Sequence, residues 1–165
     1  MHYQVIFDFN KNVSLQNWKT VNDVVMGGRS QGSISLSTQG HGQFSGRVSL
    51  ENNGGFSSVR YLPTNLKVNP ENKIKMQLKG DGKRYQIRVK HNRQASQSYV
   101  TYFETTGDWQ QITVLLKNLY PTFRGRRLDQ PNFNHHTIQE LGFLIGNKKD
   151  QDFKLLIDKI ELIEK

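Results

Sequence analysis

Apolar and polar residues alternate with a period of two along most of this chain, in short runs divided by Gly, Asn, Asp and Pro. Alternation of this kind puts successive side chains on opposite faces of a β-strand, and it is incompatible with a helical period. We therefore expect a strand in each of the following ranges: 1–9, 33–36, 44–50, 56–61, 73–79, 85–90, 99–105, 109–116, 141–145 and 153–163. The fold class is all-β, an antiparallel sandwich or barrel.

Three local predictions follow from the same pattern. The turn Gly80-Asp81-Gly82 separates two alternating runs and indicates a hairpin. The segment 117–136 is expected to be irregular, and the capping-box spacing of Thr137-Ile138-Gln139-Glu140 predicts one short helical turn. The last strand is apolar on both faces, which predicts a central or doubly covered position.

Alternation also assigns side chains to faces of the sheets. The predicted core contains Ile74, Met76, Leu78, Ile87, Val89, Ile112 and Val114. The opposite faces of two successive strands carry Lys75, Gln77 and Lys79, then Gln86, Arg88 and Lys90. We therefore expect one sheet to expose a polar, cationic face.

Composition restricts the function classes. The 165 residues carry a net charge of +9 and no cysteine, which excludes disulfides, thiol nucleophiles and thiolate metal sites. We expect one domain over residues 1–165. No apolar run is long enough to span a bilayer and no signal peptide is recognisable, so we expect a cytoplasmic protein. The basic excess raises affinity for anionic partners, although a solvated surface is the favoured interpretation of it.

Catalytic and cofactor motifs are absent from the sequence. The five histidines lack metal-ligand spacing, no serine sits in a nucleophile elbow, and no phosphate-binding glycine motif opens a helix. Asp8 and Asp158 are weak calcium candidates if the first and last strands pair. We expect no enzyme activity, no cofactor and no nucleic-acid binding. Trp18 and Trp109 are expected to be core or corner anchors, and carbohydrate binding through a polar sheet face stays open.

Two loop-like runs dense in Gly, Asn and Ser stand out, 21–30 and 52–60. Together with Trp18, 44–46, Glu51, 80–85, 121–126, 141–145 and 153–157 they closely resemble the complex I intermediate-associated protein 30 family, in the order expected for it. The resemblance implies a galactose-binding-domain-like jelly-roll sandwich. Mitochondrial members are non-enzymatic assembly factors for the respiratory NADH dehydrogenase. Because no targeting presequence is visible, this chain looks like a stand-alone bacterial member.

Two interpretations of these runs remain. In the first, Gly27-Gly28 and Gly54-Gly55 fix loop geometry, and nearby Asn and Asp side chains satisfy buried backbone groups. In the second, several arginines converge on one surface and recognise anionic groups. The candidate binding residues are Asn22, Asp23, Arg29, Asn53, Arg60, Arg88, Arg124 and Arg126. We expect a binding domain that holds a protein partner, with a carbohydrate-binding module as the alternative; the sequence does not specify the oligomeric state.

Overall fold

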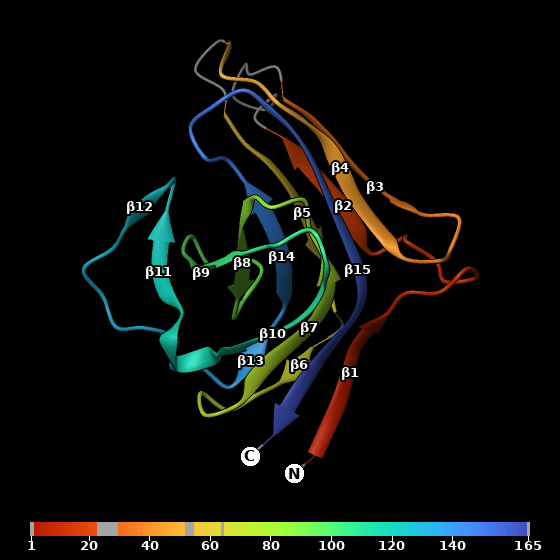
Figure 1. Cartoon of the computed structure of the whole chain (residues 1–165). Helices are drawn as coiled ribbons and strands as arrows, with labels where there is room; N and C mark the ends of the chain where they lie inside the picture. Colours follow the sequence, from red (N-terminus) through yellow and green to blue (C-terminus); the bar gives the residue numbers. More distant parts are fainter. Residues whose placement is uncertain (1, 23–29, 52–54, 64, 165) are drawn as a thin grey trace.

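Two antiparallel β-sheets pack against each other in the computed structural model, which describes residues 2–22, 30–51, 55–63 and 65–164 (Figure 1). Sheet A has the order β10-β7-β15-β4-β3, with β1 also paired to β15. Its strands are β1 (His2–Asp8), β3 (Gln31–Leu36), β4 (Gly42–Val48), β7 (Lys73–Lys79), β10 (Trp109–Leu115) and β15 (Gln151–Glu164).

Sheet B has the order β12-β11-β9-β8-β14-β5-β2. Its strands are β2 (Trp18–Asn22), β5 (Ser57–Tyr61), β8 (Arg84–Lys90), β9 (Ser98–Glu104), β11 (Tyr120–Phe123), β12 (Arg126–Arg127) and β14 (Glu140–Ile145). A two-stranded ladder joins β6 (Leu66–Lys67) to β13 (Thr137–Ile138). The all-β jelly-roll sandwich that the sequence predicts is confirmed.

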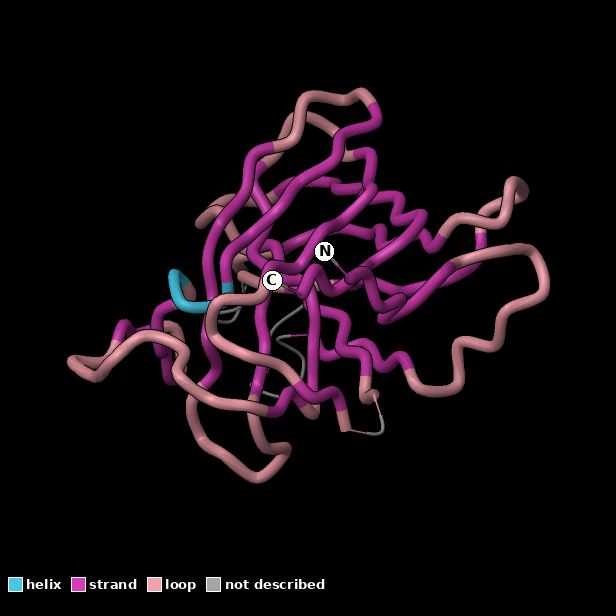
Figure 2. The backbone as a smooth tube through the Cα atoms, turned by 90° about the horizontal axis from the view of Figure 1, so that it is seen from below, coloured by secondary structure: helices cyan, strands magenta, loops and turns pink. Residues whose placement is uncertain are grey.

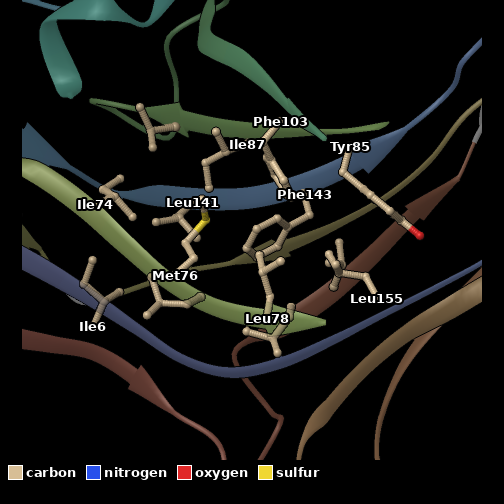
Figure 3. Packing of buried hydrophobic residues seen from close by; sticks show 14 of the residues in the cluster. Ile6, Ile74, Met76, Leu78, Tyr85, Ile87, Phe103, Leu141, Phe143 and Leu155 are labelled. Atoms are coloured by element: carbon tan, nitrogen blue, oxygen red, sulfur yellow. The ribbon is translucent and has the colours of Figure 1, made fainter. Parts of the chain in front are cut away.

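The core lies between the two sheets and follows the predicted alternation. Figure 3 shows side chains of β7 and β15 pointing toward those of β8 and β14. Met76, Leu78, Ile87 and Phe143 are fully buried, whereas Ile112 and Val114 on the edge strand β10 are only partly covered. Since burying one such side chain contributes about 1.5–3 kcal/mol, this layer is the main source of stability.

Strand β15 is central, as its apolar pattern predicts. On one side it pairs first with β4 and then with β1, and on the other side with β7. His2 and Glu164 are partners in the β1–β15 ladder, so the two ends of the chain lie together, as seen from below in Figure 2. A bulge between Ile157 and Lys159 shifts the register, which lets a 14-residue strand keep Ile157 and Ile160 in the core.

The predicted Gly80-Asp81-Gly82 hairpin is wrong. β7 belongs to sheet A and β8 to sheet B, so the turn is a corner between the sheets. The carboxylate of Asp81 accepts hydrogen bonds from the Tyr85 hydroxyl (3.0 Å) and from the Lys154 backbone N–H (2.8 Å), which fixes the corner against β15. The single predicted cationic face is consequently two faces, with Lys75 outside sheet A and Arg88 outside sheet B.

Three smaller expectations also need correction. Thr137–Ile138 is a strand and not a helical turn, because the Thr137 hydroxyl donates to the His91 carbonyl (3.0 Å) and the Gln139 N–H to the Lys90 carbonyl (2.9 Å). The segment expected to be irregular contains β11 and β12, and it begins in a 3₁₀ helix over Leu116–Asn118. Trp18 is a buried anchor as expected, but Trp109 is 41% exposed.

Candidate functional site

One row of residues crosses the outer face of sheet B from β2 to β11. Each residue of the row is the direct partner of the next across neighbouring strands. Strand alternation turns the row away from the core, because the flanking residues Val59, Ile87, Val89 and Phe143 are buried between the sheets. The row consists of Lys19, Arg60, Gly142, Arg88, Val100 and Tyr120.

Arg88 occupies the centre of the row. Its guanidinium donates to the Gln86 side-chain oxygen (2.7 Å) and to the Ser98 hydroxyl (3.1 Å). Burial and the positive charge of Arg60 together lower the pKa of Arg88 to about 10, while Glu140 opposes the shift. A nearby anion stabilises the protonated form of a guanidinium. The charged form of Arg88, which burial destabilises, would therefore be stabilised by an anion bound beside it.

Arg60 lies on the other side of Gly142 from Arg88. Its Nε is buried and has no hydrogen-bond partner. A Cβ at Gly142 would lie 2.3 Å from the Val59 carbonyl oxygen, so only glycine fits between the two arginines in this sheet. Gly142 thus brings β5 and β14 close together between two arginines, and guanidiniums can bind a carboxylate or a similar anion bidentately.

Two tyrosines lie on the same outer face: Tyr120 ends the row on β11, and Tyr102 lies on β9 beside Gln86. Arg84 stacks over the Tyr102 ring with its guanidinium carbon 4.0 Å from the centroid, and Arg127 stacks over Tyr120 at 4.3 Å. Tyr102 is 42% exposed, and burial raises the pKa of Tyr120. Stacking on aromatic rings restricts both guanidiniums and presents their N–H groups at the surface.

The sequence-predicted site residues separate into groups. Arg60 and Arg88 lie in the row. Arg124 and Arg126 belong to the exposed β11–β12 hairpin, at the opposite end of sheet B from β5, where Arg124 has a φ of 50°. Asp23, Arg29 and Asn53 lie outside the described residues.

Asn22 is directed away from this face and bonds within the protein. Its amide donates to the Gly32 carbonyl (3.3 Å) and its side-chain oxygen accepts from the Ser57 hydroxyl. Ser57 is fully buried, and so is Ser58, whose hydroxyl donates to the Val21 carbonyl (2.7 Å). These bonds connect the edge strand β2 to β3 and β5, which is a structural use of the Asn- and Ser-rich runs.

Sequence reasoning missed Lys19, Gly142 and Tyr120 as members of the row. Lys19 belongs to a strand that was not predicted, and Tyr120 to a segment expected to be irregular. The segment that forms β2, Trp18–Asn22, shows no apolar–polar alternation, so the pattern used for the other strands does not identify it. The crossover connections determine which strands become neighbours in a sheet. The alternation of residues within a strand does not predict these connections.

The remaining candidates, Asp8 and Asp158, lie on the paired strands β1 and β15. Asp8 pairs with Lys159 in the β1–β15 ladder, and Asp158 lies 3.8 Å from His41 Nε2. Within the described ranges, no group of three or more His, Cys, Asp or Glu side chains is arranged to hold a metal ion. In that same part of the chain, no helix has the length and apolar character needed to cross a membrane.

Comparison with known proteins gives a family and a fold. The model of the family described as complex I intermediate-associated protein 30 matches residues 7–157. The structure is similar to the family 11 carbohydrate-binding module of the cellulosomal cellulase Lic26A-Cel5E of Clostridium thermocellum. The TM-score is 0.71 at 16% identity, over 99% of this chain and 95% of that one.

Two further structures share the fold. The Clostridium thermocellum family 11 module in complex with a β-1,3-1,4-mixed-linked tetrasaccharide matches with a TM-score of 0.69 at 17% identity, over 98% of this chain and 95% of that one. The agarase AgWH50C matches all of this chain with 25% of its own length, at 15% identity and a TM-score of 0.67. At these identities the likeness establishes the sandwich architecture alone.

Proposed function

The chain belongs to the complex I intermediate-associated protein 30 family, and we propose that it is a non-catalytic binding domain that holds a protein partner during the assembly of a larger complex. The contact surface is the outer face of sheet B around Lys19, Arg60 and Arg88. The segment of the partner that it recognises carries carboxylates. Family membership supports a protein partner, and the row supports an acidic one.

The observation that carries the proposal is the set of uncompensated positive charges along the row. Among the described residues, no carboxylate forms an ion pair within 4.0 Å of Lys19, Arg60 or Arg88. Arg60 and Arg88 lie on either side of Gly142 in the row; burial lowers the pKa of Arg88, and the positive charge of Arg60 lowers it as well. A carboxylate bound beside them offsets the repulsion between the two charges.

The test compares two double variants with the same change of charge. Arg60→Gln/Arg88→Gln removes the two arginine charges of the row, and Lys73→Gln/Lys79→Gln neutralises two cations on the outer face of sheet A. Affinity purification from the native host identifies the partner, and titration with the purified partner measures Kd. Breaking buried charge contacts costs about 2–5 kcal/mol, so the row variant should weaken binding by roughly 30-fold or more.

The control variant should bind within about twofold of wild type, because exposed charges contribute little to affinity. Binding should also weaken as salt is raised. Equal losses in both variants, with both still folded by circular dichroism, would exclude the row as the contact surface.

Carbohydrate binding is the second candidate. It is favoured by the exposed ring of Tyr102 and the side-chain amide of Gln86 on this face, since sugars stack on aromatic rings and bond to amides. The shared fold with family 11 carbohydrate-binding modules supports it by analogy alone. Affinity electrophoresis in mixed-linked β-glucan tests it: retardation of wild type that Tyr102→Ala abolishes would favour the sugar, and unretarded migration would eliminate this glucan.

A further inference from the structure

A basic hollow lies at the end of sheet B that is nearest the β7–β8 corner. It is formed by the start of β8, the end of β9 and the β14–β15 connection. Its volume of about 570 Å³ is within the range of roughly 300–1,000 Å³ typical of small-molecule sites. Arg84 and Arg88 are four residues apart on β8, so the hollow is about 13 Å from the centre of the row. The residues that line it include Lys83, Arg84, Tyr102, Lys148, Lys149 and Gln151.

The hollow keeps a net positive charge when the ion pairs formed by its own side chains are taken into account. Four basic side chains line it, against the single carboxylate of Glu104. Lys83 is paired with Asp81, which lies behind it at 3.2 Å. In the described part of the chain, no carboxylate is ion-paired with Arg84, Lys148 or Lys149. The hollow therefore keeps an excess of two positive charges, which matches the charge of about −1.5 to −2 on a phosphate monoester.

Gln151 supplies a second, independent observation. This residue is one of those that line the hollow and is only 8% exposed, yet neither its buried amide nitrogen nor its buried amide oxygen has a hydrogen-bond partner. An unsatisfied buried polar group costs about 1–3 kcal/mol. A ligand with hydroxyl groups offers both a donor and an acceptor to this amide, whereas a bare anion offers acceptors only.

The loop that brings the two lysines to the hollow is held in an uncommon conformation. Asn147 and Lys148 both have left-handed backbones, with φ of 37° and 55°. The Asn147 amide donates to the Arg84 carbonyl (3.1 Å), which fixes the loop to β8. A left-handed lysine is disfavoured, so this bond keeps Lys148 and Lys149 at the rim of the hollow.

We propose that this hollow binds a small soluble phosphate monoester with a hydroxyl-rich body, such as a sugar phosphate. Arg84, Lys148 and Lys149 hold the phosphate, and Gln151 bonds to the hydroxyl groups. The site is separate from the row of Lys19, Arg60 and Arg88, and it does not depend on the function proposed for that row.

The test is calorimetric titration of the whole chain with glucose 6-phosphate, glucose and inorganic phosphate. We expect glucose 6-phosphate to bind more tightly than inorganic phosphate, and glucose not to bind. Lys148→Gln/Lys149→Gln should weaken the binding of glucose 6-phosphate by about tenfold or more, since each charge-assisted bond is worth over 1 kcal/mol. Both lysines are exposed, so this variant should fold.

Two further variants distinguish the hollow from the row, and the role of Gln151 from that of the basic side chains. Arg60→Gln/Arg88→Gln should bind glucose 6-phosphate as wild type does, which keeps failure of this proposal distinct from failure of the protein-binding one. Gln151→Met should remove the preference for glucose 6-phosphate over inorganic phosphate. The proposal is overturned if glucose 6-phosphate does not bind, or if Lys73→Gln/Lys79→Gln weakens it equally. Retention on phosphatidylglycerol vesicles without binding of the soluble ester would also overturn it.

Discussion

The outer faces of the two sheets are both basic, but they differ in how the charge is balanced. On sheet A, Lys75 lies 4.0 Å from its cross-strand partner Glu161, and Arg47 lies 3.1 Å from Asp152. On sheet B, Arg60 and Arg88 flank a glycine, and burial together with the charge of Arg60 lowers the pKa of Arg88. A paired charge needs nothing from outside the molecule, whereas an unpaired one is stabilised by an anion. The balance of charge, more than its amount, therefore distinguishes a solvated surface from a candidate site.

The largest expected effect comes from Gly142→Ala. The new Cβ would meet the Val59 backbone oxygen at 2.3 Å, so β5 and β14 must separate. We expect a loss of about 2–3 kcal/mol in the free energy of unfolding, because a clash with backbone atoms can be relieved only by moving the strands. Urea denaturation measures it. Gly125→Ala is the control: it has no heavy atom near its Cβ, and a φ of 78° limits its cost to about 1 kcal/mol. Equal losses would mean that the strands at Gly142 adjust freely.

Arg60→Met should leave the free energy of unfolding unchanged or raise it by up to about 1 kcal/mol, because it removes repulsion of Arg88 and a buried unsatisfied Nε. Partner affinity should fall in the same variant. Lys75→Met on sheet A is the matched control and should lower stability, since it leaves Glu161 without its partner. Chemical denaturation of the two variants, run in parallel, compares their free energies of unfolding with that of wild type. A clear loss of stability in Arg60→Met would show that the Arg60 guanidinium makes a net stabilising interaction in the folded protein.

The sequence allowed the core and the fold class to be predicted for a local reason. The alternation of apolar and polar residues within a single strand determines which side chains face the core, as it does for Met76 and Leu78. The site was only partly predictable, because the row joins residues from six strands. Its assembly depends on the crossover at Asp81, whose carboxylate bonds to distant Lys154. Local turn chemistry indicates a hairpin there, and long-range bonds override it.

A smaller effect is expected from two stacked histidines near the β8 end of sheet B. His91 and His135 lie 3.7 Å apart between ring centroids, and the His135 Nε2 is 2.9 Å from the Tyr99 hydroxyl. Burial lowers the pKa of both, and the charge of His91 lowers the pKa of His135 further. Since the unfolded chain then binds protons more readily, the stability present above the ordinary pKa of 6.5 is lost as the pH falls below it.

His135→Gln should therefore reduce the loss of stability between pH 7 and pH 5. Thermal unfolding across this range measures it, with His2→Gln on the exposed end of β1 as the control. Parallel pH profiles for wild type and His135→Gln would rule out the stacked pair as a source of acid sensitivity.

The smallest effect belongs to the balanced face. Glu161→Gln removes the partner of Lys75 and should cost about 0.2–1 kcal/mol, the usual worth of such a pair near the surface. Partner binding should not change, because the row lies on the other sheet. Urea denaturation at low and high salt measures the loss, which should shrink as salt screens the pair. Weaker partner binding in Glu161→Gln, at unchanged stability, would move the contact surface to sheet A and reverse the roles of the two faces.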